Sequence, residues 1–111
     1  MLEETPVRLV TRAHWQDDAA CRRRPLRLFF GTDKHPLMGA NAAEGREVCA
    51  MCPVARDCLL EALTTNEVEG MRAGYLPHER AHTMERVGGQ LLAAMIDYDA
   101  GVFYQPPPRR T

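Results

Sequence analysis

The chain has 111 residues, the size of one small domain, and 45% of them are hydrophobic while only 6% are aromatic. Its formal net charge of −1 at pH 7 argues against strong binding of the whole chain to nucleic acid or to an anionic membrane. The amino terminus lacks the apolar run of a signal peptide, and no apolar stretch approaches the ~20 residues that span a bilayer. We therefore expect a cytoplasmic protein with a thin core, which a bound metal or cluster often supplements in small domains.

The predicted elements of the first half are short helices joined by loops. Residues 15–21 favour one or two helical turns, and Pro25 disfavours helix in the basic run that follows. After a loop over residues 32–38, the composition of residues 40–51 predicts a helix. Pro53 then marks a boundary, because proline disfavours helix before it and suits the first turn of a new one.

The clearest helical pattern covers residues 54–66. Apolar residues recur there at three- and four-residue steps and form one face, while polar residues, Asp57 among them, are expected to face solvent. A turn is expected at 70–74, and two further helices are expected over 77–87 and 90–98. Because little of the sequence alternates with period two, the predicted fold is mostly α, with four to five short helices.

The chain is predicted to be a single domain with two flanking segments. Residues 1–14 are expected to be a flexible lead-in, residues 15–98 the domain, and residues 99–111 a proline-rich, weakly basic tail.

Four cysteines carry the clearest chemical signal. Three of them fall within VCAMCPVARDC, where Cys49 and Cys52 form a C-x2-C pair and Cys58 follows on the inner face of the predicted helix. Cys21 comes from the upstream segment, so folding can bring four thiolates to one centre. Because cytoplasmic thiols are normally reduced, grouped cysteines more often bind metal or do redox work than form structural disulfides.

The spacing alone leaves several chemistries open. A compact triple plus one remote cysteine is closer to iron–sulfur ligation than to the paired C-x2-C knuckles of zinc sites, but zinc, a redox dithiol and unligated core thiols remain alternatives. The basic run after Cys21 fits either a countercharge for a cluster or a solvated loop. No Ser/His/Asp set, phosphate-binding loop or paired carboxylate arrangement is readable, so we expect the protein not to be an enzyme.

These residues together resemble a known family. Trp15, Cys21, the Phe29–Phe30 pair and the run CAMCPVARDC are similar to the WhiB-like proteins of actinobacteria and their phages, over roughly residues 15–80. The spacing C-x27-C-x2-C-P-V-x3-C is specific to that pattern. The resemblance implies a small helical transcription regulator whose [4Fe–4S] cluster reacts with oxygen and nitric oxide. The implied ligands of the cluster are Cys21, Cys49, Cys52 and Cys58.

The resemblance also implies binding to region 4 of the principal sigma factor of RNA polymerase, but the sequence departs from the family at the turn that makes this contact. The family turn reads G-[VI]-W-G-G, whereas residues 70–74 place Arg72 at the position of the Trp. An arginine cannot supply the same apolar anchor, so other contacts are needed for a sigma partner. The candidate partner-binding residues are Trp15, Phe29, Phe30, Met71, Arg72 and Tyr75.

The second departure is the carboxy-terminal region, which in the family is a basic arm for promoter DNA. From Tyr75 onward, four arginines are balanced by four acidic residues. Only Arg109 and Arg110 resemble a DNA arm, and two arginines make few phosphate contacts. Contact with promoter DNA is therefore expected to be weak or to depend on a partner.

Three functions follow from these observations. The leading one is an iron–sulfur transcription regulator that senses redox state or nitric oxide and acts through the sigma factor, promoter DNA or both. The first alternative is a sensor or antagonist that binds a protein partner without touching DNA. The second is a thiol–disulfide protein that works without a cluster through Cys49 and Cys52, although the chain lacks the βαβ pattern of thioredoxin-like enzymes.

Overall fold

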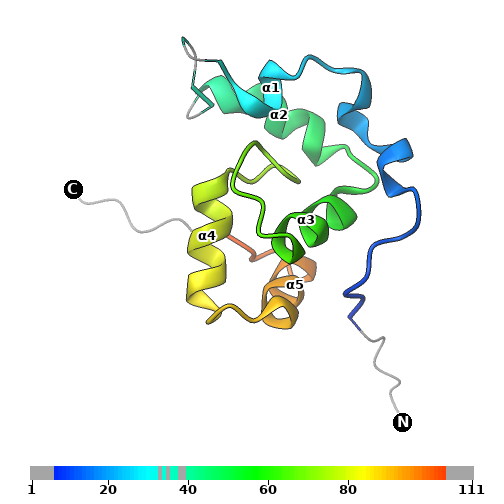
Figure 1. The fold of residues 1–111 in the computed structure, drawn as a ribbon, viewed down its shortest axis with the longest axis vertical. Helices are drawn as coiled ribbons and strands as arrows, with labels where there is room; N and C mark the ends of the chain where they lie inside the picture. Colours follow the sequence, from blue (N-terminus) through cyan, green and yellow to red (C-terminus); the bar gives the residue numbers. More distant parts are fainter. Residues whose placement is uncertain (1–6, 33, 35, 38–39, 105–111) are drawn as a thin grey trace, which may run out of the picture.

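The computed structural model describes residues 7–32, 34, 36–37 and 40–104. In these ranges the elements, in chain order, are the 3₁₀ turns η1 (Trp15–Asp18) and η2 (Ala20–Arg23) and the helices α1 (Arg27–Phe30), α2 (Ala40–Ala50), α3 (Ala55–Thr64), α4 (Pro77–Arg86) and α5 (Leu91–Asp99). Helix α1 packs on α2, while α3 and α4 pack on α5 (Figure 1). The prediction of a mostly α domain of four to five short helices is confirmed. No helix in the described part of the chain is long and apolar enough to cross a bilayer.

Helices α2 to α5 lie where the sequence predicts them, but α1 corrects the expectation for the segment after Pro25. The amides of Leu28 and Phe29 donate to the carbonyls of Pro25 and Leu26 and so close a helical turn. A proline just ahead of such a turn costs little, because the first amides of a helix have no intrahelical partner in any case. Only the residue before the proline is restricted, and Arg24 is indeed extended at φ −105° and ψ 154°.

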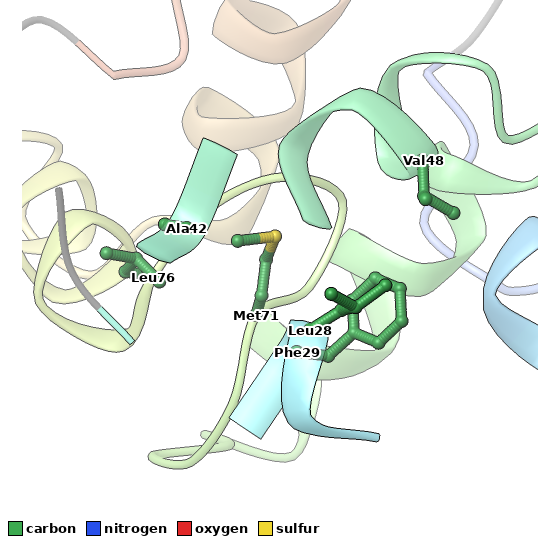
Figure 2. Packing of buried hydrophobic residues seen from close by; sticks show 6 residues of the cluster. All are labelled: Leu28, Phe29, Ala42, Val48, Met71 and Leu76. Atoms are coloured by element: carbon green, nitrogen blue, oxygen red, sulfur yellow. The ribbon is translucent and has the colours of Figure 1, made fainter. Parts of the chain in front are cut away.

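The core consists of two separate clusters of buried side chains. The first joins α1, α2 and the segment of residues 70–76, and Met71 lies between Leu76 and Phe29 within it (Figure 2). Its buried members are Leu28, Phe29, Ala42, Val48, Met71 and Leu76. The second joins α3, α5 and the chain after α5, with buried members Leu59, Leu60, Ala94, Met95 and Phe103. Each cluster is small, so neither alone offsets much of the conformational entropy lost on folding.

The segment of residues 70–76 connects the two clusters. Met71 belongs to the first cluster, while Tyr75 packs against the second. Between them Arg72 and Tyr75 exchange two backbone hydrogen bonds, of 3.0 and 2.9 Å, which close the turn predicted from the glycines. This connection sets the position of one half of the domain relative to the other.

The side chain of Asp57 on α3 corrects a second expectation, because it is buried at 1% exposure rather than facing solvent. It accepts hydrogen bonds from the guanidinium groups of Arg8 and Arg12 and from the Arg12 amide, the last at 3.1 Å. Burial opposes ionisation of Asp57, but these hydrogen bonds outweigh it and lower the pKa of the carboxyl group. The amino-terminal segment is thereby fixed against α3.

Packing reaches beyond both ends of the predicted 15–98 domain. Arg8 and Arg12 belong to the predicted lead-in, and Phe103, which is 1% exposed in the second core, belongs to the predicted tail. Asp99, the last residue of α5, pairs with Arg56 of α3 through hydrogen bonds of 2.8 and 3.0 Å. The division of the chain into three parts stays a prediction, and any domain boundary has to include these contacts.

Replacing Gly45 by alanine is expected to destabilise the protein, although alanine normally stabilises a helix interior by up to about 1 kcal/mol relative to glycine. Gly45 is a buried residue of α2, and a Cβ atom there would collide with the backbone carbonyl oxygen of Leu28. That oxygen belongs to α1 and cannot rotate away, so we expect a loss of roughly 1–3 kcal/mol of unfolding free energy, typical of overpacking. Chemical denaturation of the anaerobic protein measures the change.

Glu44→Ala provides the matched control for this substitution. Glu44 is the exposed neighbour of Gly45 on the same helix, so its replacement should change the unfolding free energy by less than about 0.5 kcal/mol. Equal stability of the Gly45→Ala variant and wild type would show that α1 does not pack as closely on α2 as described.

Candidate metal centre

All four cysteines line one cavity of about 370 Å³. Cys21 comes from η2, Cys49 from the end of α2, Cys52 from the connection between α2 and α3, and Cys58 from the first turns of α3. The cavity lies where the two cores meet, because Val48 and Met71 of the first core line it together with Ala73, which packs against the second.

The local sequence explains how three cysteines reach one cavity. The amides of Met51 and Cys52 donate to the carbonyls of Val48 and Cys49, at 3.2 and 3.1 Å, so the chain turns tightly after α2. Pro53 follows at once, and the Cys58 amide then donates to the Val54 carbonyl at 3.0 Å as α3 begins. The C-x2-C-P spacing therefore turns the chain beside the cavity and starts α3 so that Cys58 also lines it.

The donor set fits a soft metal centre. Four thiols are the ligands preferred by iron–sulfur clusters and by zinc, and not by magnesium or calcium. All four are free cysteines rather than disulfides. Among the described residues, no three cysteine, histidine or carboxylate side chains are grouped closely enough to hold one metal ion. Four thiols that line one cavity are compatible with a metal cluster.

Donors from other residues reach the sulfurs of Cys49, Cys52 and Cys58. The Ala20 amide donates to Cys52 Sγ at 3.4 Å, and the Gly74 amide donates to Cys49. The third donor is Arg72, whose Nε lies 3.1 Å from Cys58 Sγ. Donors of this kind orient metal ligands and stabilise negative charge on them.

The thiols of Cys21 and Cys49 are not prepared for nucleophilic attack. Burial raises the pKa of Cys49 to about 11, in spite of the Gly74 hydrogen bond. Burial also raises the pKa of Cys21, with further contributions from the nearby Cys58 and Cys52. Reactive dithiols have lowered pKa values, whereas thiols of this kind ionise when a metal centre binds them.

Five of the six predicted partner-binding residues line the same cavity, all but Tyr75, and they differ in exposure. Trp15, Phe29 and Met71 are buried at 7%, 5% and 3%, so they form apolar walls of the cavity. Phe30 is 57% exposed at its edge, and Tyr75 is partly buried. Their role in partner binding stays a prediction. The predicted DNA-binding residues Arg109 and Arg110 lie outside the described residues.

Arg72 points into the protein rather than away from it. Its side chain is 17% exposed, and besides Cys58 Sγ it contacts the Cys58 carbonyl at 3.2 Å and the carboxylate of Glu61 at 2.9 Å. Fourteen residues separate Arg72 from Cys58, so no local spacing predicts the contact. The only signal in the sequence is that an arginine replaces the expected Trp.

Comparisons with known proteins identify the family of the chain. The family model for transcription factor WhiB matches residues 15–83. The transcriptional regulator WhiD of Streptomyces coelicolor is 36% identical over 89 residues, which cover 78% of this chain and 80% of WhiD. WhiB1 of Mycobacterium tuberculosis is 35% identical over 66 residues, which cover 60% of this chain and 79% of WhiB1. WhiB of S. coelicolor is 33% identical over 66 residues, which cover 60% of this chain and 70% of that WhiB. No solved structure gave a significant match. The chain therefore belongs to the WhiB family of transcription factors and not to a family of enzymes.

Proposed function

We propose that this protein is an iron–sulfur transcription regulator that senses redox state or nitric oxide in the cytoplasm and acts through the sigma factor, promoter DNA or both. The observation that carries the proposal is the single cavity lined by all four cysteines at the junction of the two cores. In this proposal Cys21, Cys49, Cys52 and Cys58 hold a [4Fe–4S] cluster, which supplies iron that reacts with oxygen and nitric oxide.

The exposure of the ligands supports a sensing role. Cys21 is exposed, whereas Cys49, Cys52 and Cys58 are partly buried, so one side of the site is open to small solutes. The two cores meet at the cysteines, and loss of their shared ligand would free one core from the other. Because a ligand that binds only the folded state adds its binding free energy to stability, loss of the cluster would be transmitted to the fold.

Phe30 offers exposed apolar surface beside the cavity for a sigma partner. Its ring is 57% exposed and contacts the region of Gly70, at the turn where the family carries its Trp. Cluster-loaded protein should bind an isolated sigma region 4 fragment, and Phe30→Ala should weaken binding at least tenfold if the ring is a central anchor. Anaerobic titration by isothermal calorimetry measures the affinity.

Leu92→Ala is the matched control for Phe30→Ala. Leu92 is 47% exposed on α5, at the other end of the molecule from α1 (Figure 1). Its substitution should leave sigma binding unchanged. Absence of binding by the cluster-loaded wild type would rule out sigma region 4 as the partner. An equal loss of affinity in Phe30→Ala and Leu92→Ala would show that Phe30 is not a specific anchor of the interface.

A partner-binding sensor that does not touch DNA is the second candidate, and the arginines after Tyr75 favour it. Arg80 is 3% exposed and bonds to backbone carbonyls, while Arg86 pairs with Asp97 at 2.7 Å. Neither is therefore free to contact phosphates. Among the arginines after Tyr75, this leaves Arg109 and Arg110 for DNA binding.

The salt dependence of promoter binding distinguishes the two functions. If both terminal arginines contact phosphates, the slope of log K against log salt concentration should be about −1.8, since each phosphate contact contributes about −0.9. Fluorescence anisotropy with the cluster-loaded protein, with and without the sigma fragment, measures this slope, and R109Q/R110Q should abolish it. A wild-type protein with no salt-dependent slope, with or without the sigma fragment, would favour the sensor that does not contact DNA.

A further inference from the structure

The guanidinium of Arg72 forms a directed contact with one of the four cysteine sulfurs. Its Nε–H donates to Cys58 Sγ at 3.1 Å, and its terminal amino group donates to the Cys58 carbonyl at 3.2 Å. Two adjacent donors of the planar guanidinium thus bind two acceptors of the same residue. Lysine has no such pair of fixed donors, so this geometry is specific to arginine.

Surrounding groups hold Arg72 in this position. Its side chain is 17% exposed, and its terminal nitrogens bond to Glu61 at 2.9 Å and lie 4.0 Å from Glu67. Its backbone is paired with Tyr75 on both sides of the turn. The contact with Cys58 is therefore part of a built network and not a chance position of a mobile surface side chain.

The same network places opposite charges at the cavity. Glu61 lines the cavity beside Arg72 and Cys58, so the sulfur has one cation in direct contact and one carboxylate behind that cation. Arg22 also lines the cavity, but its guanidinium bonds to the backbone carbonyl of Asp17 at 3.2 Å and its side chain is 62% exposed. An exposed charge of this kind is largely screened by water.

We propose that Arg72 is a positioning residue that sets the reduction potential of the cluster by stabilising negative charge on the Cys58 sulfur. This proposal rests on the proposed function, because it requires the four cysteines to hold a [4Fe–4S] cluster. Hydrogen bonds to ligand sulfurs and nearby charge are recognised determinants of such potentials. Because a reduced cluster has one more negative charge, the cation and the hydrogen bond stabilise the reduced form and raise its midpoint potential.

The test is a dithionite titration of the cluster-loaded protein, followed by electron paramagnetic resonance and visible absorbance. One electron passes from dithionite to the cluster, and no bond to Cys58 forms or breaks. In R72Q the midpoint potential should fall. We expect the ratio of reduced to oxidised cluster at a fixed potential to fall on the order of tenfold, which is about 59 mV for a one-electron couple.

R22Q is the matched control, because it removes the same charge from the lining of the same cavity without touching a cysteine sulfur. Its midpoint potential should equal that of wild type. An unchanged potential in R72Q, or an equal fall in R22Q, would overturn the proposal.

E61Q provides an independent test that does not depend on R72Q holding its cluster. Removing the Glu61 carboxylate leaves the Arg72 charge uncompensated by its nearest partner, so the midpoint potential should rise. A fall or no change in E61Q would contradict the proposal. If the wild-type protein itself holds no cluster, the proposed function fails; if it holds one and the variants do not shift its potential, only the role of Arg72 fails.

Discussion

Replacing any one of the four cysteines by serine is expected to abolish cluster binding and to remove most of the helical structure. Among the described residues, the two cores have only six and five buried apolar members, and they meet at the cavity that the cysteines line. In small metal-binding domains the metal site rarely exists in the unfolded chain, so the free energy of metal binding stabilises the folded state. We expect apo-like far-ultraviolet circular dichroism and loss of visible absorbance for each variant.

Ala50→Ser is the matched control for the cysteine series. Ala50 is the exposed neighbour of Cys49 at the end of α2. Its substitution therefore introduces a serine side chain without removing a sulfur. This variant should retain the cluster and the helical signal. A cysteine variant such as Cys58→Ser that retained full ellipticity would show that the two cores are stable without a shared ligand.

Replacing Arg80 by alanine is the second change with a large expected effect. The Arg80 side chain donates to the carbonyls of Gly70 and Tyr75, at 2.9 and 2.6 Å, and to those of Glu67 and Glu69. It is 3% exposed, so its removal leaves buried carbonyl groups without their donor. Hydrogen bonds from charged groups contribute about 1.5–3 kcal/mol each, and their contributions overlap within one side chain, so we expect a loss of roughly 3–5 kcal/mol.

The consequence of that loss extends to the site, because the carbonyls lie in and beside the 70–76 segment that connects the two cores and carries Arg72. In chemical denaturation of the cluster-loaded protein, Arg80→Ala should therefore both lower the unfolding free energy and accelerate cluster loss. Arg86→Ala is the control on the same helix. Arg86 pairs with Asp97 at 35% side-chain exposure, and the Phe103 carbonyl to which it also donates keeps its bond from the Thr83 hydroxyl, so its loss should cost only about 1 kcal/mol. Similar effects of the two substitutions would show that Arg80 does not organise the turn.

The sequence predicts those features of the fold that depend on neighbouring residues. Pro53 and Pro77 mark helix starts through the geometry of the proline ring, and the apolar period of residues 54–66 identifies the inner face of α3. The spacing of Cys49, Cys52 and Cys58 similarly fixes a turn and a helix that reach one cavity. These are local constraints, which a single chain displays directly.

Features that depend on distant partners were not predictable in this way. Asp57 lies on the polar side of the α3 pattern, and it is buried only because Arg8 and Arg12, at least 45 residues away, neutralise it. The inward direction of Arg72 likewise depends on Cys58 and Glu61, which reach it only once the turn has folded onto α3. Paired charges of this kind leave no periodicity in the sequence, since either partner alone resembles an ordinary surface residue.

The most direct test of the central claim, that the four cysteines hold an iron–sulfur cluster, is the metal content of the anaerobically purified protein together with its visible spectrum. The account predicts a brown protein with broad visible absorbance and about four irons and four acid-labile sulfides per chain, in agreement with ligation by four thiolates. Its colour should bleach on addition of nitric oxide. A colourless protein that carries stoichiometric zinc and no iron would contradict it.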